Sequence, residues 1–164
     1  MATFIPGIMC AICERPIHSR SEAVAFPPFV ANEADPLFIF SDSVVHADEF
    51  RAHPLAPEVN ARLAEALERT QPAHRVCKIC GERVANPDDY LGLGHLVEDA
   101  EHPLYQFNYG HFHRSCLLNW RDLKQLVAEL QALDSSGAWK GESLRKAIAT
   151  LLQIAARARV EGSG

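Results

Sequence analysis

The sequence has no long apolar run and no excess of basic residues. The N-terminal stretch "MATFIPGIMC" lacks a basic region, and Pro6 and Gly7 interrupt its short apolar part, so we expect neither a signal peptide nor a membrane span. With 16 Lys and Arg against 21 Asp and Glu, the formal net charge is -5. Phosphate binding needs clustered Lys and Arg, so this composition disfavours nucleic acid as a partner.

Cysteine is scarce and odd in number, with five in 164 residues and none after Cys116. We expect a cytoplasmic protein. In that compartment, an odd number of cysteines argues against a disulfide framework. The thiols should therefore be reduced and able to bind a metal. No nucleophile with a paired base stands out in the sequence, which argues against an enzyme.

Three pairs of potential metal ligands share one spacing. Each pair lies 67 positions apart: Cys10 and Cys77, Cys13 and Cys80, His46 and His113. The same offset relates the segments "PLFIF" at 36–40 and "PLYQF" at 103–107. Self-similarity at a fixed offset indicates duplication of one structural unit. We predict two tandem zinc-binding repeats, 1–70 and 71–137, followed by a C-terminal helix and a flexible tail at 138–164.

The predicted fold is small and α+β. We expect short strands at "EAVAFPPFV" with "PLFIF" and at "LGLGHLV" with "PLYQF", and a helix beginning at each ligand histidine. In the second repeat, apolar residues at spacings of three and four predict one helix from about Leu117 to Leu133. In the first, prolines predict a short turn, then a helix from near Pro57 that carries Val59, Leu63 and Leu67.

The C-terminal helix is expected from about Ser143 to Val160. Its apolar face should comprise five residues: Leu144, Ile148, Leu151, Leu152 and Ala155.

The second repeat has the ligand set of a zinc site. Zinc takes four tetrahedral ligands, a C-x2-C turn supplies two thiolates, and an H-x2-C pair at a helix start supplies two more. Cys77, Cys80, His113 and Cys116 fit this pattern. The alternative is a set of ordinary buried thiols, but all five cysteines fall within the two repeated frames. His111 is a substitute ligand, a neighbour of the site or a surface residue, and the last two are favoured.

The first repeat has Cys10, Cys13 and His46, with Glu49 at the position of Cys116. Glu49 shares a helical face with His46, whereas Asp48 points elsewhere. Three hypotheses remain: a site closed by Glu49, a site holding water at an open position, and a repeat that has lost its metal. The four cysteines of the two C-x2-C turns could also pair across the repeats in a cross-braced arrangement.

The stretch "GHFHRSCLLNW" at 110–120 resembles the corresponding segment of RING-type ubiquitin ligases. More broadly, C-x2-C followed by H-x2-C at a helix start resembles the treble-clef zinc fold of RING and LIM modules. The resemblance rests on Cys77, Cys80, His113, Cys116 and Trp120, and implies tandem treble-clef-like fingers. A RING would continue with a further C-x2-C after Trp120, and a LIM module would have shorter spans between its ligands.

The favoured function is a non-catalytic adaptor in which zinc supports a protein-binding surface; adaptors of bacterial defence or toxin immunity are one fitting class. Trp120 belongs either to the core or to that surface, where it would anchor a protein partner. The RING-like stretch implies an alternative, a ligase scaffold in a ubiquitin-like conjugation system. A remote alternative is a zinc hydrolase or deaminase, since "HAD" at 46–48 before "CKIC" resembles a deaminase pattern with Asp in place of the catalytic Glu.

Overall fold

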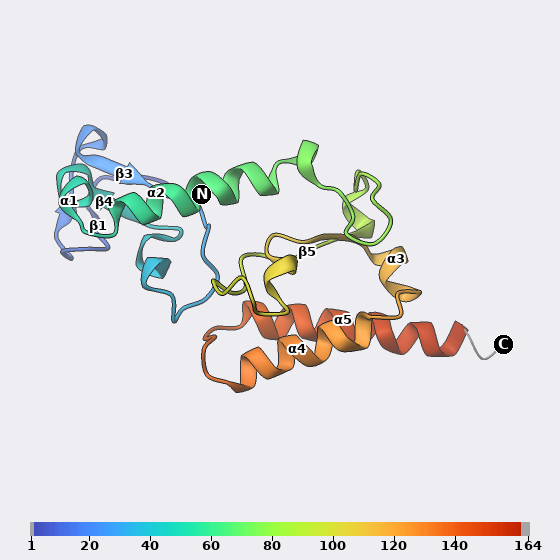
Figure 1. The fold of residues 1–164 in the computed structure, drawn as a ribbon. Helices are drawn as coiled ribbons and strands as arrows, with labels where there is room; N and C mark the ends of the chain where they lie inside the picture. Colours follow the sequence, from blue (N-terminus) through green and yellow to red (C-terminus); the bar gives the residue numbers. More distant parts are fainter. Residues whose placement is uncertain (1, 162–164) are drawn as a thin grey trace. The chain divides into compact units, whose positions relative to one another are not determined.

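The computed structural model of the chain describes residues 2–161. It divides into two compact units, Met1–Leu67 (unit 1) and Glu68–Gly164 (unit 2). Each is a small α+β assembly of short antiparallel strand pairs and helices (Figure 1). Of the predicted flexible tail "EGSG", Glu161 ends the C-terminal helix, and 162–164 lie outside the described residues. None of the described helices combines the length and the apolar character needed to cross a membrane.

Unit 1 consists of two small strand pairs followed by helices. Its elements are β1 (Ile8–Met9), β2 (Pro16–Ile17), η1 (Arg20–Glu22), β3 (Ala23–Ala25), η2 (Pro36–Phe40), β4 (Val44–His46), α1 (Ala47–Ala52) and most of α2 (Ala56–Thr70), where η marks a 3₁₀ turn. The last three residues of α2 belong to unit 2. Strand β1 pairs with β2, and β3 with β4, both antiparallel. The β1–β2 pair carries the first C-x2-C turn, and β4 leads directly into α1.

Unit 2 repeats this order and adds a long C-terminal helix. Its elements are η3 (Pro72–His74), η4 (Pro87–Asp89), β5 (Tyr90–Gly92), η5 (Tyr105–Phe107), β6 (His111–His113), α3 (Arg114–Leu118), α4 (Leu123–Ser135) and α5 (Ser143–Glu161). An antiparallel bridge between Val76 and Arg83 stands where unit 1 has β1 and β2. Helices α4 and α5 lie side by side and run in opposite directions (Figure 1).

The offset of 67 residues recurs in the backbone geometry. Ala23 pairs with His46 in unit 1, and Tyr90 pairs with His113 in unit 2. Each C-x2-C turn is followed by a residue in the left-handed region, Glu14 with φ 57° and Gly81 with φ 75°. The two units therefore share strand register and turn conformation as well as sequence spacing.

The predicted strands at "PLFIF" and "PLYQF" are wrong: the first segment is η2, and 105–107 of the second is η5. Asp35 starts η2 by accepting a hydrogen bond from the Leu37 backbone N–H at 2.8 Å, and Pro36 follows at the first position of the turn. Leu37 and Phe40 are both fully buried. Their spacing of three places them on one side of a 3₁₀ turn, so an apolar run resembled a strand without being one.

The single helix predicted from Leu117 to Leu133 is also wrong, because α3 ends at Leu118 and α4 begins at Leu123. The Trp120 N–H bonds to the Leu117 carbonyl, and the Leu123 N–H to the Trp120 carbonyl, both at 3.2 Å. These short-range bonds form a turn. Unit 1 breaks at the same place, between α1 and α2.

The two units fill their cores differently. In unit 1 four phenylalanines meet with ring centroids 4.9–6.3 Å apart: Phe26, Phe29, Phe40 and Phe50. In unit 2 apolar side chains of α3, α4 and α5 form one cluster around Leu117, Leu130 and Leu151, which are fully buried. Two of the apolar residues predicted on these helices are exposed, Leu67 to 51% and Leu152 to 45%. Ala66 and Ile154 take the buried positions, so each apolar face is rotated slightly from the predicted one.

Candidate metal centres

In unit 2 the four predicted ligands converge on one point. Cys77 and Cys80 come from the C-x2-C turn, His113 ends β6, and Cys116 lies in the first turn of α3. One donor atom from each residue lies within 4.8 Å of all the others. The chain reaches this arrangement because β6 leads into α3 without a linker, so His113 and Cys116 share the helix start.

The donor spacing fits a zinc ion. With bonds of about 2.3 Å to sulfur and about 2.0 Å to nitrogen, a tetrahedral zinc ion separates a thiolate from an imidazole nitrogen by about 3.5 Å. The Nδ1 atom of His113 lies 3.4 Å from the Cys80 Sγ and 3.8 Å from the Cys116 Sγ. Three sulfurs and an imidazole are also a soft set of donors, and such donors bind zinc in preference to harder cations.

The pKa values of two thiols of this group, Cys77 and Cys116, are shifted in opposite directions. Burial raises the pKa of Cys77, but backbone N–H donors from Cys80, His113 and Ile79 outweigh burial and lower it to about 6. Burial, with the neighbouring Cys80 and Cys77 sulfurs, raises the pKa of Cys116 to about 12. Three thiols packed together disfavour full ionisation, and a divalent cation would reverse that balance.

The start of α3, the helix that carries Cys116, is held by an acidic residue from η4. The Asp89 carboxylate accepts hydrogen bonds from the Ser115 backbone N–H and from the Ser115 hydroxyl, both at 2.8 Å. It therefore caps the N-terminus of α3, where carboxylates are favourable. Burial raises the pKa of Asp89, but these bonds outweigh burial and lower it.

In unit 1 the structure brings together Cys10, Cys13, His46 and Glu49, again within 4.8 Å of one another. Cys13 Sγ lies 3.5 Å from His46 Nδ1, close to the corresponding distance in unit 2. Glu49 Oε2 lies 3.4 Å from Cys10 Sγ and 3.7 Å from His46 Nδ1. The Glu49 carboxylate therefore occupies the place that the Cys116 thiol holds in unit 2.

Asp48, the alternative fourth ligand, is not a member of this group. Its carboxylate accepts a hydrogen bond from the Glu49 backbone N–H at 3.0 Å. The cross-braced alternative does not describe the structure either, since each group draws all four donors from one unit.

Arg15 is a neighbour of the first group that the sequence did not reveal. Its Nη2 donates to Glu49 Oε1, and its Nε donates to Cys13 Sγ at 3.4 Å. Hydrogen bonds from the Cys13 thiol and the Arg15 guanidinium, against some desolvation, lower the pKa of Glu49 to about 2. A basic residue two positions after Cys13 and an acidic residue in the ligand frame were the only sequence signals of this pairing.

The chain matches no protein-family model, no curated protein and no solved structure with which it was compared. The two groups must therefore be interpreted from their own geometry. What that geometry establishes is two sets of four side chains that could each hold a metal ion.

His111 is buried, and its ring is fully engaged outside the group. Its Nε2 donates to the Arg69 carbonyl at 2.8 Å, and its Nδ1 accepts from the Tyr90 hydroxyl at 3.0 Å. Burial lowers the pKa of this imidazole, consistent with the neutral tautomer that these two bonds require. His111 is therefore not among the four converging donors and supports the strand that carries His113.

Trp120 is half-buried and packs on two aromatic rings, with centroid distances of 6.1 Å to Phe107 and 6.2 Å to Phe112. In unit 1, His53 stands in the same relation to Phe40, at 5.1 Å. The remaining surface of Trp120 lines a pocket of about 480 Å³. This Trp120 pocket has apolar and charged lining residues, among them Phe107, Leu126, Lys78, Asp122 and Glu129. Trp120 thus serves the core and also faces a surface pocket.

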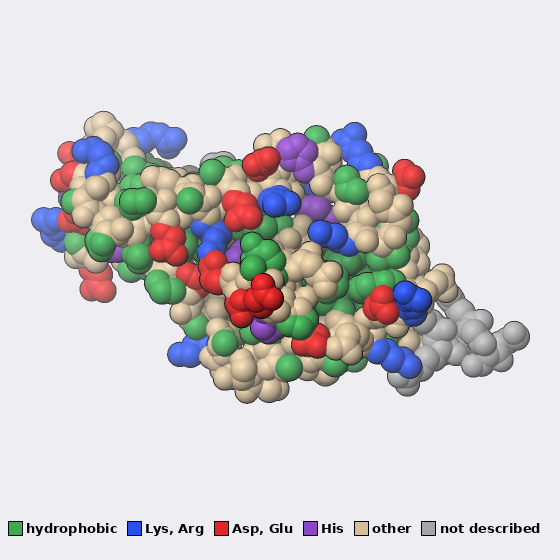
Figure 2. All heavy atoms as spheres, in the orientation of Figure 1, with side chains coloured by type: hydrophobic (Ala, Val, Ile, Leu, Met, Phe, Trp, Pro, Cys, Tyr) green, Lys and Arg blue, Asp and Glu red, His purple; other side chains and the backbone are tan. Residues whose placement is uncertain are grey.

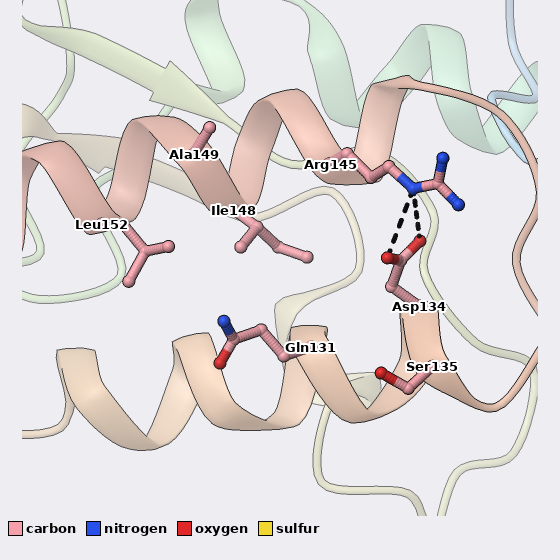
Figure 3. A pocket seen from close by; sticks show the side chains of 7 residues that line it. All are labelled: Gln131, Asp134, Ser135, Arg145, Ile148, Ala149 and Leu152. Atoms are coloured by element: carbon pink, nitrogen blue, oxygen red, sulfur yellow. Dashed lines mark hydrogen bonds and ion pairs between the residues drawn. The ribbon is translucent and has the colours of Figure 1, made fainter.

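A second pocket, of about 420 Å³, lies between α4 and α5 (Figure 3). Ile148 and Leu152 give it an apolar side. At one end the Arg145 Nε donates to both Asp134 carboxylate oxygens, at 3.2 and 3.3 Å. We call it the α4–α5 pocket.

Proposed function

We propose that this protein is a cytoplasmic adaptor in which two structural zinc ions stabilise two treble-clef-like fingers that bind a protein partner. One observation carries the proposal: each group supplies four protein donors, three sulfurs with an imidazole in unit 2 and two sulfurs, an imidazole and a carboxylate in unit 1. Catalytic zinc sites keep a coordination position for water or substrate, whereas structural sites fill all four.

The treble-clef assignment is supported by the order of elements. In each unit a C-x2-C turn precedes an antiparallel strand pair, the second strand ends at a histidine, and a short helix carries the fourth donor. The zinc ion would join the turn to the helix start. Structural zinc contributes roughly 10–16 kcal/mol in small zinc-finger peptides, more than a small core supplies by itself.

The partner-binding role is supported by the Trp120 pocket. It combines an aromatic and aliphatic lining with charged side chains at 78, 122 and 129, a mixture that resembles the centre and rim of protein–protein interfaces. Figure 2 shows acidic and basic side chains interspersed on the face in view. Mixed charge of this kind favours a protein partner over nucleic acid, which needs a clustered basic surface.

The decisive experiment is native mass spectrometry of the chain purified from its own host without chelators. Two zinc ions per chain and a retained protein partner are expected. Trp120→Ala should lose the partner and keep both zinc ions, whereas Trp120→Phe should keep the partner and the zinc ions. Leu152→Ala, in the α4–α5 pocket, is the control and should also keep the partner. A chain without zinc would refute the structural role of the metal, and a partner retained by Trp120→Ala would refute the assigned surface.

The RING-like ligase scaffold is a second candidate, favoured by the position of Trp120 directly after the group of Cys77, Cys80, His113 and Cys116. Against it, the described residues place one group of four donors in unit 2, whereas a RING needs two. The protein lost on Trp120→Ala would then be the carrier enzyme of a conjugation system, loaded with its ubiquitin-like protein. Binding of a ubiquitin-like carrier enzyme to the purified chain, measured directly, separates this candidate from other adaptors.

A further inference from the structure

The Glu49 carboxylate is divided between two tasks. Its Oε2 faces the donor group, 3.4 Å from Cys10 Sγ and 3.7 Å from His46 Nδ1. Its Oε1 accepts a hydrogen bond from Arg15 Nη2. One oxygen therefore lies among the donor atoms of the group and the other is bound by a guanidinium.

Arg15 also contacts a second donor of the same group. Its Nε donates to Cys13 Sγ at 3.4 Å, so one planar guanidinium spans a carboxylate and a sulfur. Arginine suits this task because its N–H donors are fixed in a rigid fork, whereas lysine offers a single compact charge. A carboxylate bound at one oxygen loses freedom to rotate, and its other oxygen is then presented in a defined direction.

What distinguishes the two groups is the fourth donor, not the net charge. Two thiolates with a carboxylate and three thiolates carry the same formal charge, and only in unit 1 does an arginine contact the fourth donor. In unit 2 the residue at the position of Arg15 is Glu82, and the fourth donor is the thiol of Cys116. The arginine thus accompanies the carboxylate and is absent where a cysteine takes its place.

The Arg15–Glu49 ion pair adds little to the free energy of folding. The Arg15 side chain is 70% exposed and that of Glu49 is 20% exposed, and water screens exposed ion pairs. Its effect lies in the orientation of the carboxylate.

We propose that Arg15 is the positioning residue that makes Glu49 a metal ligand and thereby closes the first site with four protein donors. This rests on the proposed binding of metal by both units. Neighbours that orient a ligand affect metal affinity by about 10–100-fold, and the effect of Arg15 should be confined to unit 1.

The test uses the full chain loaded with Zn²⁺, with affinity at each site measured by competition with a chromophoric chelator. Arg15→Ala should weaken the first site 10–100-fold and leave the second unchanged, and Arg15→Lys should recover part of the loss. Arg51→Ala removes the same charge from α1 of the same unit and should leave both sites unchanged. Circular dichroism checks that each variant retains its helices.

A second background identifies the route by which Arg15 acts. Glu49→Cys gives unit 1 the donor set of unit 2, so adding Arg15→Ala in that background should cost less than threefold. An equal loss in both backgrounds would show that Arg15 acts other than through Glu49 and would overturn the inference. Cobalt(II) substitution gives an independent readout, because loss of the carboxylate changes the visible spectrum of a four-coordinate site.

The possible failures are distinguishable. Two zinc ions in the unaltered chain, with Arg15→Ala binding both as tightly, would overturn the role of Arg15 and leave the proposed function standing. A single zinc ion in the unaltered chain, lost on Cys116→Ser, would overturn both the closed first site and the role of Arg15.

Discussion

Ser41 and Asn108 lie 67 residues apart and make the same three hydrogen bonds in their own units. The Ser41 hydroxyl accepts from the backbone N–H groups of Phe29 and Val30 and donates to the Val30 carbonyl. The Asn108 amide bonds in the same way to the backbone of Leu96 and Val97. A hydroxyl and an amide therefore fix one loop conformation, which shows that the duplicated geometry is maintained by different chemistry.

Removing the Asn108 amide should destabilise unit 2. Asn108→Ala leaves two backbone N–H groups and a carbonyl without their side-chain partner, and an unsatisfied buried group costs about 1–3 kcal/mol. Asn108→Ser should be less destabilising, because serine makes the equivalent bonds in unit 1. Thermal unfolding of the zinc-loaded protein, followed by circular dichroism, measures both; equal losses for the two variants would contradict this account of the loop.

Zinc stoichiometry should distinguish Glu49 from Asp48. Glu49→Ala removes a converging donor, so the first site should bind zinc more weakly or exchange the carboxylate for water. Asp48→Ala, one residue earlier, should leave the zinc count at two. Native mass spectrometry over a series of chelator concentrations provides the comparison. A zinc lost on Asp48→Ala and kept on Glu49→Ala would reverse the assignment of the fourth ligand.

Acid should release zinc from both units. The ligands bind metal only when deprotonated, so zinc affinity falls as pH falls. In unit 2, Cys77 has a pKa of about 6, and below that pH proton uptake by its thiolate competes with the metal. In unit 1, Glu49, with a pKa of about 2, stays ionised over this range and keeps its charge. Zinc release between pH 7 and pH 5, recorded with a chromophoric indicator, should rise as the pH is lowered.

The cap on α3 should be measurable separately from the metal ligands. Asp89→Ala removes both hydrogen bonds to Ser115 and should reduce the stability of unit 2 by about 1 kcal/mol, the typical value of a helix cap. Asp88→Ala, the neighbouring exposed carboxylate, is the matched control. Chemical denaturation of the zinc-loaded chain tests this, and an equal effect of the two substitutions would mean that general charge, not capping, is responsible.

The spacing of Cys, His and Glu residues was enough to predict which side chains converge, because ligand frames are local and the 67-residue offset identifies them twice. Backbone form was less predictable. The run "PLFIF" suggested a strand, although Asp35 and Pro36 favour the start of a turn. The 3₁₀ turn is the conformation in which Leu37 and Phe40 are both buried in the core, and the sequence alone does not show that burial.

The break between α3 and α4 illustrates a second limit. Nothing between Leu118 and Leu123 resembles a helix breaker, but the equivalent segment of unit 1 contains Pro54. Because the two repeats align residue by residue, Pro54 in unit 1 would have predicted the helix break in unit 2 as well. Arg15 was not predictable in this way, because its position in unit 2 is Glu82 and its contacts with Cys13 and Glu49 arise only from the folded turn.

The different fillings of the two cores also give the molecule a built-in optical asymmetry. Both of its tryptophans, Trp120 and Trp139, belong to unit 2, whereas the core of unit 1 is built around phenylalanines. Intrinsic tryptophan emission will therefore follow one half of the chain, while far-ultraviolet ellipticity follows both. Recording both signals during metal removal would show whether the two units unfold together or one after the other.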